Sequence, residues 1–202
     1  LDVETPDVPL TNYSVRNGTN PQDIVIESAS RAYVLRLAAA NVLIVNPATG
    51  DSVGTIDLSS LADADGLPEM IDGLLHDGDL YVLLQLLDEN AWFAPTGPGV
   101  VAVVDPADGT IKRTISLTIE NPELMIMDEG ALYVAGGAWG DMTSGGVDRV
   151  ASGAATATRI TEAEAMRGRP TAAAHVDDPN SIWGVVSQSC PACAVSALDA
   201  TT

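Results

Sequence analysis

Short apolar runs separated by polar turns recur along the whole chain. In residues 41–58 an apolar run ends at Asn46, a turn closes on Gly50, and a second strand-like run follows. The same layout returns at residues 100–117 and begins again at residues 193–202. Each run is short and is bounded by Gly, Pro or Asp, which favours β-strands over buried helices. The pattern therefore predicts an all-β fold.

Four segments share a longer layout: a proline, an apolar strand, a polar turn, and a second strand centred on an aromatic residue. The aromatic residues are Tyr33, Tyr81, Tyr133 and Trp183. Their spacing of about fifty residues matches one four-stranded blade of a β-propeller. The apolar runs are nearly continuous because a blade stacked between two others buries both of its faces. We predict a β-propeller of four-stranded antiparallel blades, with about four blades in one domain over residues 1–202.

The chain does not divide into complete blades at its two ends. The predicted blade units span about residues 20–58, 68–117, 121–161 and 170–199, and the last lacks its fourth strand. Residues 11–19 form an orphan outer strand. In many propellers an N-terminal strand completes the C-terminal blade and so removes a sheet edge. Two arrangements stay open: a small ring closed by this strand, and a fragment of a larger propeller.

Two segments, residues 46–56 and 105–115, carry a resemblance to a known repeat. They resemble YVTN-type propellers, which are bacterial surface-layer and secreted proteins, some of them lactonase-like. Asp105 and Asp199 match the aspartate that follows a β-run in that family, and Asn46 stands in its place in the first unit. The resemblance implies an extracellular, periplasmic or cell-surface protein, usually with a binding role.

The charge of the chain narrows the class of partner. Twenty-eight acidic and nine basic residues give a formal net charge of −19. Such a chain repels phosphate backbones, so we expect no nucleic-acid partner, whereas cations and basic proteins are favoured. No run of about 18 uncharged apolar residues occurs, so no membrane span is predicted.

Aromatic residues in two long loops are the candidates for ligand contacts. In a propeller blade, the loops at residues 88–98, 136–146 and 59–67 fall on one face. The candidates there are Trp92, Phe93, Trp139 and Asp141. Aromatic loop residues above a rigid scaffold often form binding surfaces. The alternative is that they fold over and cap the ends of the blades.

A short acidic loop and a cysteine pair offer further chemistry. Asp63 and Asp65 alternate before Gly66, as in the centre of a calcium loop, although a plain polar turn explains them equally. Calcium is therefore the only cofactor that the sequence offers. Cys190 and Cys193 predict a local disulfide or two inert thiols, because no helix follows them and no zinc ligands lie beside them.

No nucleophile elbow or phosphate-binding glycine loop is present, so no catalytic residue is assigned. The favoured interpretation is a secreted or cell-surface binding module whose loop face takes a protein, carbohydrate or cation. One alternative is a propeller enzyme of lactonase, lyase or quinone-dependent dehydrogenase type, with a channel metal. Its ligands would come from the inner strands, where Asp23, Asp72 and His175 lie. A second alternative is a structural component of a surface layer.

Overall fold

A computed structural model of the chain describes residues 12–138, 145–162, 169–175, 181–187 and 194–199, with the side chains of residues 12–138 and 145–160. The described residues form β-strands joined by turns, with two single-turn 3-10 helices, η1 (Ser59–Leu61) and η2 (Glu89–Ala91). In this described part no helix has the length and apolar character needed to cross a membrane.

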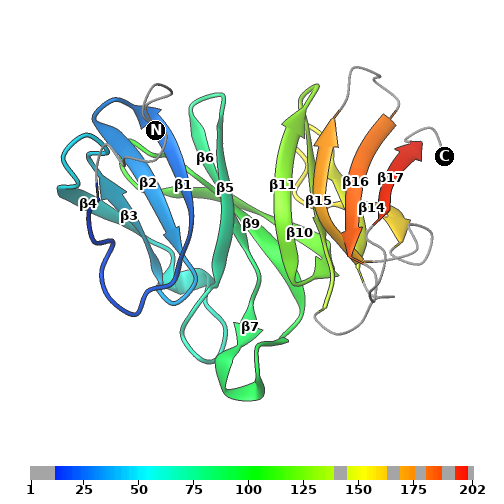
Figure 1. Cartoon of the computed structure of the whole chain (residues 1–202), viewed down its shortest axis with the longest axis horizontal. Helices are drawn as coiled ribbons and strands as arrows, with labels where there is room; N and C mark the ends of the chain where they lie inside the picture. Colours follow the sequence, from blue (N-terminus) through cyan, green and yellow to red (C-terminus); the bar gives the residue numbers. More distant parts are fainter. Residues whose placement is uncertain (1–11, 139–144, 163–168, 176–180, 188–193, 200–202) are drawn as a thin grey trace.

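Four antiparallel sheets follow one another along the chain (Figure 1). The first sheet contains β1 (Pro21–Ser28), β2 (Arg31–Arg36), β3 (Asn41–Val45) and β4 (Ser52–Asp57). The second contains β5 (Met70–His76), β6 (Asp79–Leu84), β9 (Pro98–Val104) and β10 (Ile111–Glu120). The third contains β11 (Pro122–Asp128), β12 (Ala131–Gly136), β13 (Gly146–Val150) and β14 (Thr158–Glu162). The fourth contains β15 (Arg169–His175), β16 (Ser181–Ser187) and β17 (Ala194–Asp199).

The all-β prediction and the four-stranded antiparallel sheets are confirmed. The sheets fall within a few residues of the predicted units at about 20–58, 68–117, 121–161 and 170–199. The sequence pattern did not predict a small separate hairpin, β7 (Leu87–Asp88) with β8 (Ala94–Pro95), which is inserted between β6 and β9.

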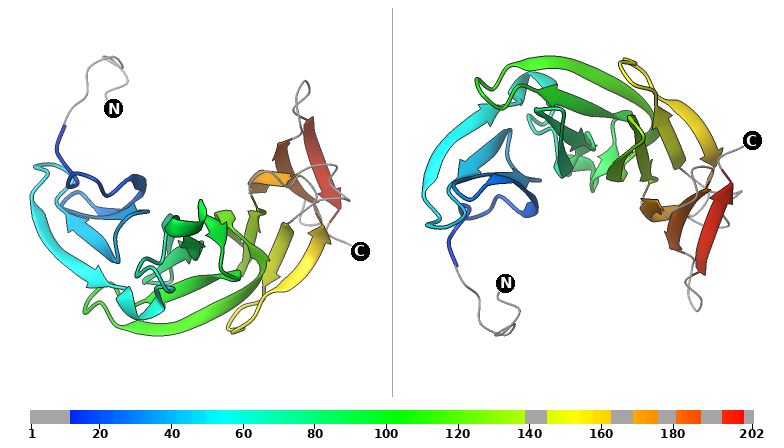
Figure 2. Two further views of the ribbon diagram at one scale, coloured as in Figure 1. Left: turned by 90° about the horizontal axis from the view of Figure 1, so that it is seen from below. Right: turned by 90° about the horizontal axis from the view of Figure 1, so that it is seen from above.

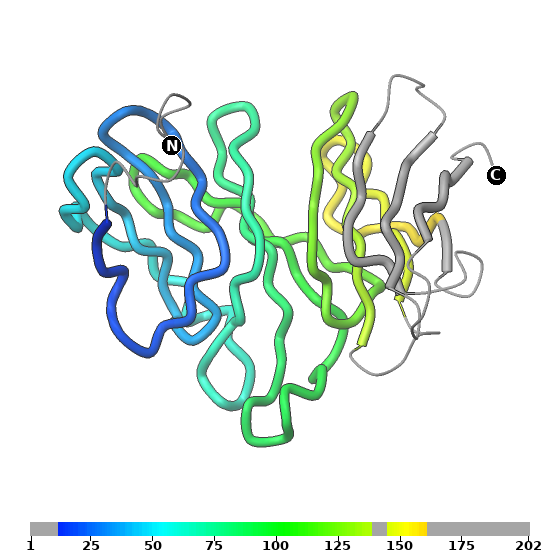
Figure 3. Tube along the Cα trace, viewed as in Figure 1, coloured from blue at the N-terminus to red at the C-terminus, as the bar shows by residue number. Residues whose placement is uncertain are grey.

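The sheets stand side by side in an open arc, a propeller-like arrangement (Figure 2). The first strand of each sheet lies on the inner side of the arc, and β4, β10 and β14 follow its outer rim. Contacts between β1 and β5, β5 and β11, and β11 and β15 join successive sheets. The Cα trace in Figure 3 shows the first three sheets in the same order.

Strand β6 shows why the apolar runs are continuous. Its alternate residues Leu80, Val82 and Leu84 belong to the apolar layer shared with the first sheet. Tyr81 and Leu83 point the other way, into the layer shared with the third sheet. Because side chains alternate across a strand, a sheet covered on both faces needs apolar residues at successive positions. The prediction that blades bury both faces is confirmed for the second sheet.

Two inter-sheet aspartates, Asp23 and Asp72, connect the inner strands. Asp23 Oδ2 accepts a hydrogen bond from Gly73 N at 3.1 Å, and Asp72 Oδ2 accepts one from Met125 N at 2.6 Å. Both aspartates follow a register shift in their strand, and the same position in β11 is Leu124. The first three sheets are therefore joined by the same side-chain contact, which the third sheet does not repeat toward the fourth.

The N-terminal segment differs from the prediction. Residues 12–19 form no strand; instead Tyr13 and Val15 pack against the apolar outer face of the first sheet, on Val34 and Leu43. A Cβ atom at Gly50 would lie 2.5 Å from the Tyr13 ring, so only glycine permits this close approach. The first and fourth sheets lie at opposite ends of the arc (Figure 2). The small ring closed by an orphan outer strand is therefore wrong, because this segment buries its apolar side chains locally.

Candidate functional site

The hairpin β7–β8 projects from one face of the arc, below the second sheet in Figure 1, and Trp92 follows η2 between its two strands. The Trp92 side chain is 93% exposed. Asp88 starts the turn by accepting a hydrogen bond from Asn90 N at 2.8 Å, and Phe93 N donates to Asp88 O at 2.9 Å. Trp92 and Phe93 both have left-handed backbone, with φ of 59° and 57°. For Trp92, the alternative that loop aromatics cap the sheet is wrong.

Three carboxylates from residues 63–69 hold the hairpin in place. Asp63, Asp65 and Glu69 each accept one hydrogen bond from it. Thr96 Oγ1 donates to Asp63 at 3.0 Å, and Glu89 N donates to Asp65 at 2.8 Å. Leu87 N donates to Glu69 at 2.9 Å. The acidic loop and the aromatic loop, which sequence reasoning placed on one face, are thus in direct contact.

Glu69 is the member of this set that sequence reasoning missed. Its side chain is fully buried, and Oε1 has no hydrogen-bond partner in the structure. The pKa of Glu69 is raised to about 8, chiefly by burial and also by the charges of Asp65, Asp63 and Glu89, while the hydrogen bond from Leu87 N lowers it. The repeat itself marks Glu69 as unusual, through the residue type at the position just before the first strand of each of the first three sheets. The matching left-handed positions before β1 and β11 hold Asn20 and Asn121, and Glu69 replaces that asparagine.

One carboxylate oxygen of Asp63 and one of Asp65 accept hydrogen bonds within the turn itself. Asp63 Oδ1 accepts from Asp65 N at 3.1 Å, and Asp65 Oδ1 accepts from Leu67 N at 3.0 Å. Their other oxygens take the two hairpin donors described above. Across the described ranges, no three acidic, histidine or cysteine side chains converge on a point suited to a metal. The geometry matches the polar-turn alternative, and a calcium site stays a prediction.

Several predicted residues fall where the structure describes no side chain. Trp139, Asp141, Cys190 and Cys193 lie outside the described residues, and His175 is described only as part of β15. Of the predicted ligand contacts, the structure therefore brings together Trp92 and Phe93 with the acidic loop.

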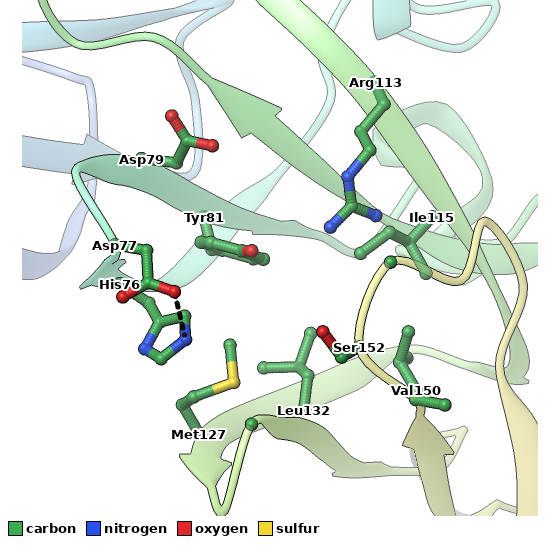
Figure 4. Close-up of a pocket in the computed structure, with 13 residues that line it drawn as sticks. His76, Asp77, Asp79, Tyr81, Arg113, Ile115, Met127, Leu132, Val150 and Ser152 are labelled. Carbon is green, nitrogen blue, oxygen red and sulfur yellow. Dashed lines mark ion pairs between the residues drawn. The ribbon is translucent and has the colours of Figure 1, made fainter.

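A cavity of about 210 Å³ lies between the second and third sheets, on the face of the arc opposite the hairpin (Figure 1). Figure 4 shows the residues that line it. It is formed by the β5–β6 turn, the start of β10, the β11–β12 turn and the end of β13. Its polar side chains are His76, Asp77, Asp79, Tyr81, Arg113 and Ser152, and its apolar side chains are Ile115, Met127, Leu132 and Val150.

Charged groups around this cavity are partly paired. Arg113 Nη1 donates to Ala154 O at 3.0 Å, which ties β10 to the third sheet. Lys112 Nζ lies 2.6 Å from Asp79 and 3.1 Å from Asp105. Hydrogen bonds that Lys112 donates to Asp79 and Asp105 raise its pKa. Sequence reasoning missed Arg113 and Tyr81, since both lie within strands and only the packing of two sheets brings them together.

Comparison with known proteins gives a likeness of fold. No protein-family model and no curated protein matches the sequence. A computationally designed protein, Ika4, is similar with a TM-score of 0.54 and 10% identity, over 92% of this chain and 94% of that one. The extracellular domain of the putative one-component system BT4673 from B. thetaiotaomicron is similar with a TM-score of 0.56 and 15% identity. That match covers 86% of this chain and 21% of the other.

A third solved structure, a protein of unknown function from Bacteroides caccae, is similar with a TM-score of 0.51 and 13% identity. The match covers 93% of this chain and 64% of that protein. At such low identity these likenesses concern the fold alone: the chain shares an arrangement of antiparallel sheets with natural and designed proteins.

Proposed function

We propose that the four sheets are blades of a β-propeller and that the chain is an exported or cell-surface binding module. Its contact surface is the Trp92 hairpin, residues 87–96 together with Asp63 and Asp65, and its partner is a protein with a basic surface. The observation that carries this proposal is the 93% exposure of Trp92 on a loop held by three carboxylates.

The backbone of the hairpin supports a binding role. Leu86, Trp92 and Phe93 all have positive φ, between 56° and 59°. Each such residue costs about 1 kcal/mol or more, and such strain is concentrated at ligand-binding sites. Trp92 stays in solvent despite this cost, so packing of its side chain within the chain does not explain the strained backbone. Contact with a partner would bury a large apolar side chain at little cost in conformational entropy, since the loop is already fixed.

The charge around Trp92 supports a basic partner. Asp88 and Glu89 belong to the hairpin, and Asp63 and Asp65 contact it. An arginine or lysine placed over the indole ring gains about 1 kcal/mol from the cation–π interaction. The carboxylates and the net charge of −19 would steer a basic surface toward this face. The likeness to an extracellular domain is in keeping with an exported location.

The test uses Trp92→Ala, alone and combined with Trp139→Ala, and the control Val53→Ala. Val53 is an apolar residue on β4 that is 58% exposed. The probe is a fluorescent decapeptide of alternating arginine and glycine, titrated at physiological salt. We expect Trp92→Ala to weaken binding about fivefold with an unchanged melting temperature, since one cation–π contact is lost. Equal loss of stability and binding would contradict the proposal.

A glycan array with the same variants examines the other class of ligand. Trp92-dependent binding of a sugar, without peptide binding, would replace the basic protein by a carbohydrate. The enzyme alternative has less support, since Asp23 and Asp72 already accept backbone hydrogen bonds from neighbouring strands.

A further inference from the structure

The cavity between the second and third sheets lies opposite the Trp92 hairpin, so it is separate from the contact surface proposed above (Figures 1 and 4). We propose that this cavity binds a small monocarboxylate with a short apolar tail. The carboxylate meets Arg113 and the hydroxyl of Tyr81, and the tail lies on the apolar floor.

Arg113 supplies the anion-binding end. It starts from β10 and directs its guanidinium into the cavity (Figure 4). Nη1 is held by Ala154 O at 3.0 Å, which fixes the orientation of the side chain. Within the described part of the chain, Nε and Nη2 make no hydrogen bond and Arg113 has no carboxylate partner. A guanidinium that is already oriented and has free donors is suited to a carboxylate, whose two oxygens match its planar geometry.

Hydroxyl groups complete the polar end. The Tyr81 ring is only 8% exposed, and its hydroxyl points toward the same space as the Arg113 guanidinium (Figure 4). Neither Tyr81 nor Ser152 uses its hydroxyl in a hydrogen bond to the described residues. Each hydroxyl is a donor that a carboxylate oxygen can accept from, and hydrogen bonds to a charged acceptor are the stronger kind.

Apolar side chains close the bottom of the cavity. Ile115, Leu132 and Val150 line it but are almost fully buried, so they expose little surface to a ligand, and Met127 lies beside them. The volume of about 210 Å³ is somewhat larger than that of an engineered cavity of about 150 Å³ that holds benzene. A ligand of about ten non-hydrogen atoms therefore fits, such as an aromatic or medium-chain carboxylic acid.

The surrounding charge favours one negative charge over two. Asp77 and Asp79 also line the cavity, and Asp79 is only partly offset by Lys112, which it shares with Asp105. A phosphate dianion would double both its attraction to Arg113 and its repulsion from these carboxylates and from the net charge of −19. Because carboxylates outnumber the guanidinium around the cavity, the single charge of a monocarboxylate gives the smaller net repulsion.

The experiment titrates benzoate and hexanoate into the 15N-labelled protein and follows the amide signals of Gly130 and Gly153, which border the cavity. Benzamide is the neutral probe of the same shape. We expect saturable shifts with both carboxylates and binding at least tenfold weaker with benzamide. Arg113→Gln should weaken benzoate binding at least tenfold and Tyr81→Phe about threefold or more, since hydrogen bonds to a charge are lost. The control is Arg31→Gln, which removes an equal charge from a side chain that also donates to a backbone carbonyl.

Three results would overturn the proposal: no saturable shift at either glycine, equal binding of benzamide and benzoate, or equal binding by Arg113→Gln and Arg31→Gln. Loss of the Ala154 contact threatens the fold of Arg113→Gln. Tyr81→Phe makes no such change, so equal benzoate binding by Tyr81→Phe and the wild type would by itself remove Tyr81 from the site. Because the peptide probe and the carboxylates bind on opposite faces of the arc, failure of one proposal leaves the other standing.

Discussion

Glu69 shows how one residue at the base of the hairpin makes stability depend on pH. Its pKa in the folded protein is about 8, against 4.5 for the ordinary side chain, because burial penalises the charged form. Between these two pH values the folded state holds a proton that the unfolded state has lost. The contribution of Glu69 is therefore fully present below about pH 4.5 and decreases as the pH rises through 8.

The first prediction is that Glu69→Gln removes this dependence. A neutral amide has the same shape and keeps an oxygen for Leu87 N, without a buried charge at high pH. We expect the variant to be about 2 kcal/mol or more stable than the wild type at pH 9 and similar to it at pH 5. Urea unfolding at both pH values measures the difference. The control Glu120→Gln changes an exposed residue of β10; parallel curves for the wild type and Glu69→Gln would contradict the prediction.

Residue by residue, the sequence indicated the exposed contacts better than the cavity. Trp92 and Phe93 were found because aromatic residues in a polar loop have no packing role. Arg113 lies in a strand that alternates polar and apolar positions, a pattern that indicates only a solvent-facing side. Its place beside Tyr81 depends on how two sheets meet, which local periodicity does not encode.

At the level of elements, the hairpin β7–β8 has strands of only two residues each. Such a hairpin is not stable alone. It forms because Asp63, Asp65 and Glu69, from a preceding loop, satisfy its donors. The long strands carry their own signal of continuous apolar residues, so they were predictable, whereas this element depends on contacts with a separate loop.

The second prediction compares two glycines that follow the hairpin. A Cβ atom at Gly99 would lie 2.5 Å from Pro122 and 2.8 Å from Leu84 O, whereas one at Gly97 would meet nothing within 4 Å. We expect Gly99→Ala to lower the free energy of unfolding by about 1–3 kcal/mol, since the proline ring and a backbone oxygen yield little. Gly97→Ala should be neutral or slightly stabilising. Chemical denaturation measures both, and equal stability of the two variants would show that β9 can shift away from the third sheet.

At the level of the whole molecule, the inter-sheet aspartates bear on how the sheets hold together. Asp72 accepts hydrogen bonds from Gly73 N and Met125 N, and burial raises its pKa to about 6. The third prediction is that Asp72→Ala lowers the free energy of unfolding by about 1–3 kcal/mol, because it leaves the Met125 amide without its acceptor. The control is Asp57→Ala, which removes an exposed carboxylate that accepts hydrogen bonds from its near neighbour Ser59 and, among the described residues, from no other sheet. Calorimetry distinguishes the two, and an equal effect would mean that the inter-sheet contact adds nothing.

The fifty-residue period was enough to predict the sheets and their order. The period could not predict whether the arc closes, because closure depends on where the N-terminal segment buries Tyr13 and Val15. The outer face of the first sheet accepts this short apolar segment, and the absence of a Cβ atom at Gly50 leaves room for the Tyr13 ring. In the sequence alone, Gly50 looks like an ordinary turn glycine.

Leu124 occupies the position at which Asp23 and Asp72 reach toward the next sheet. Its side chain has no oxygen that can accept a hydrogen bond from a backbone amide, so this particular aspartate contact does not continue at that position of β11. Under a pulling force applied at the two termini, we expect Asp23→Leu and Asp72→Leu to lower the force at which the first three sheets separate.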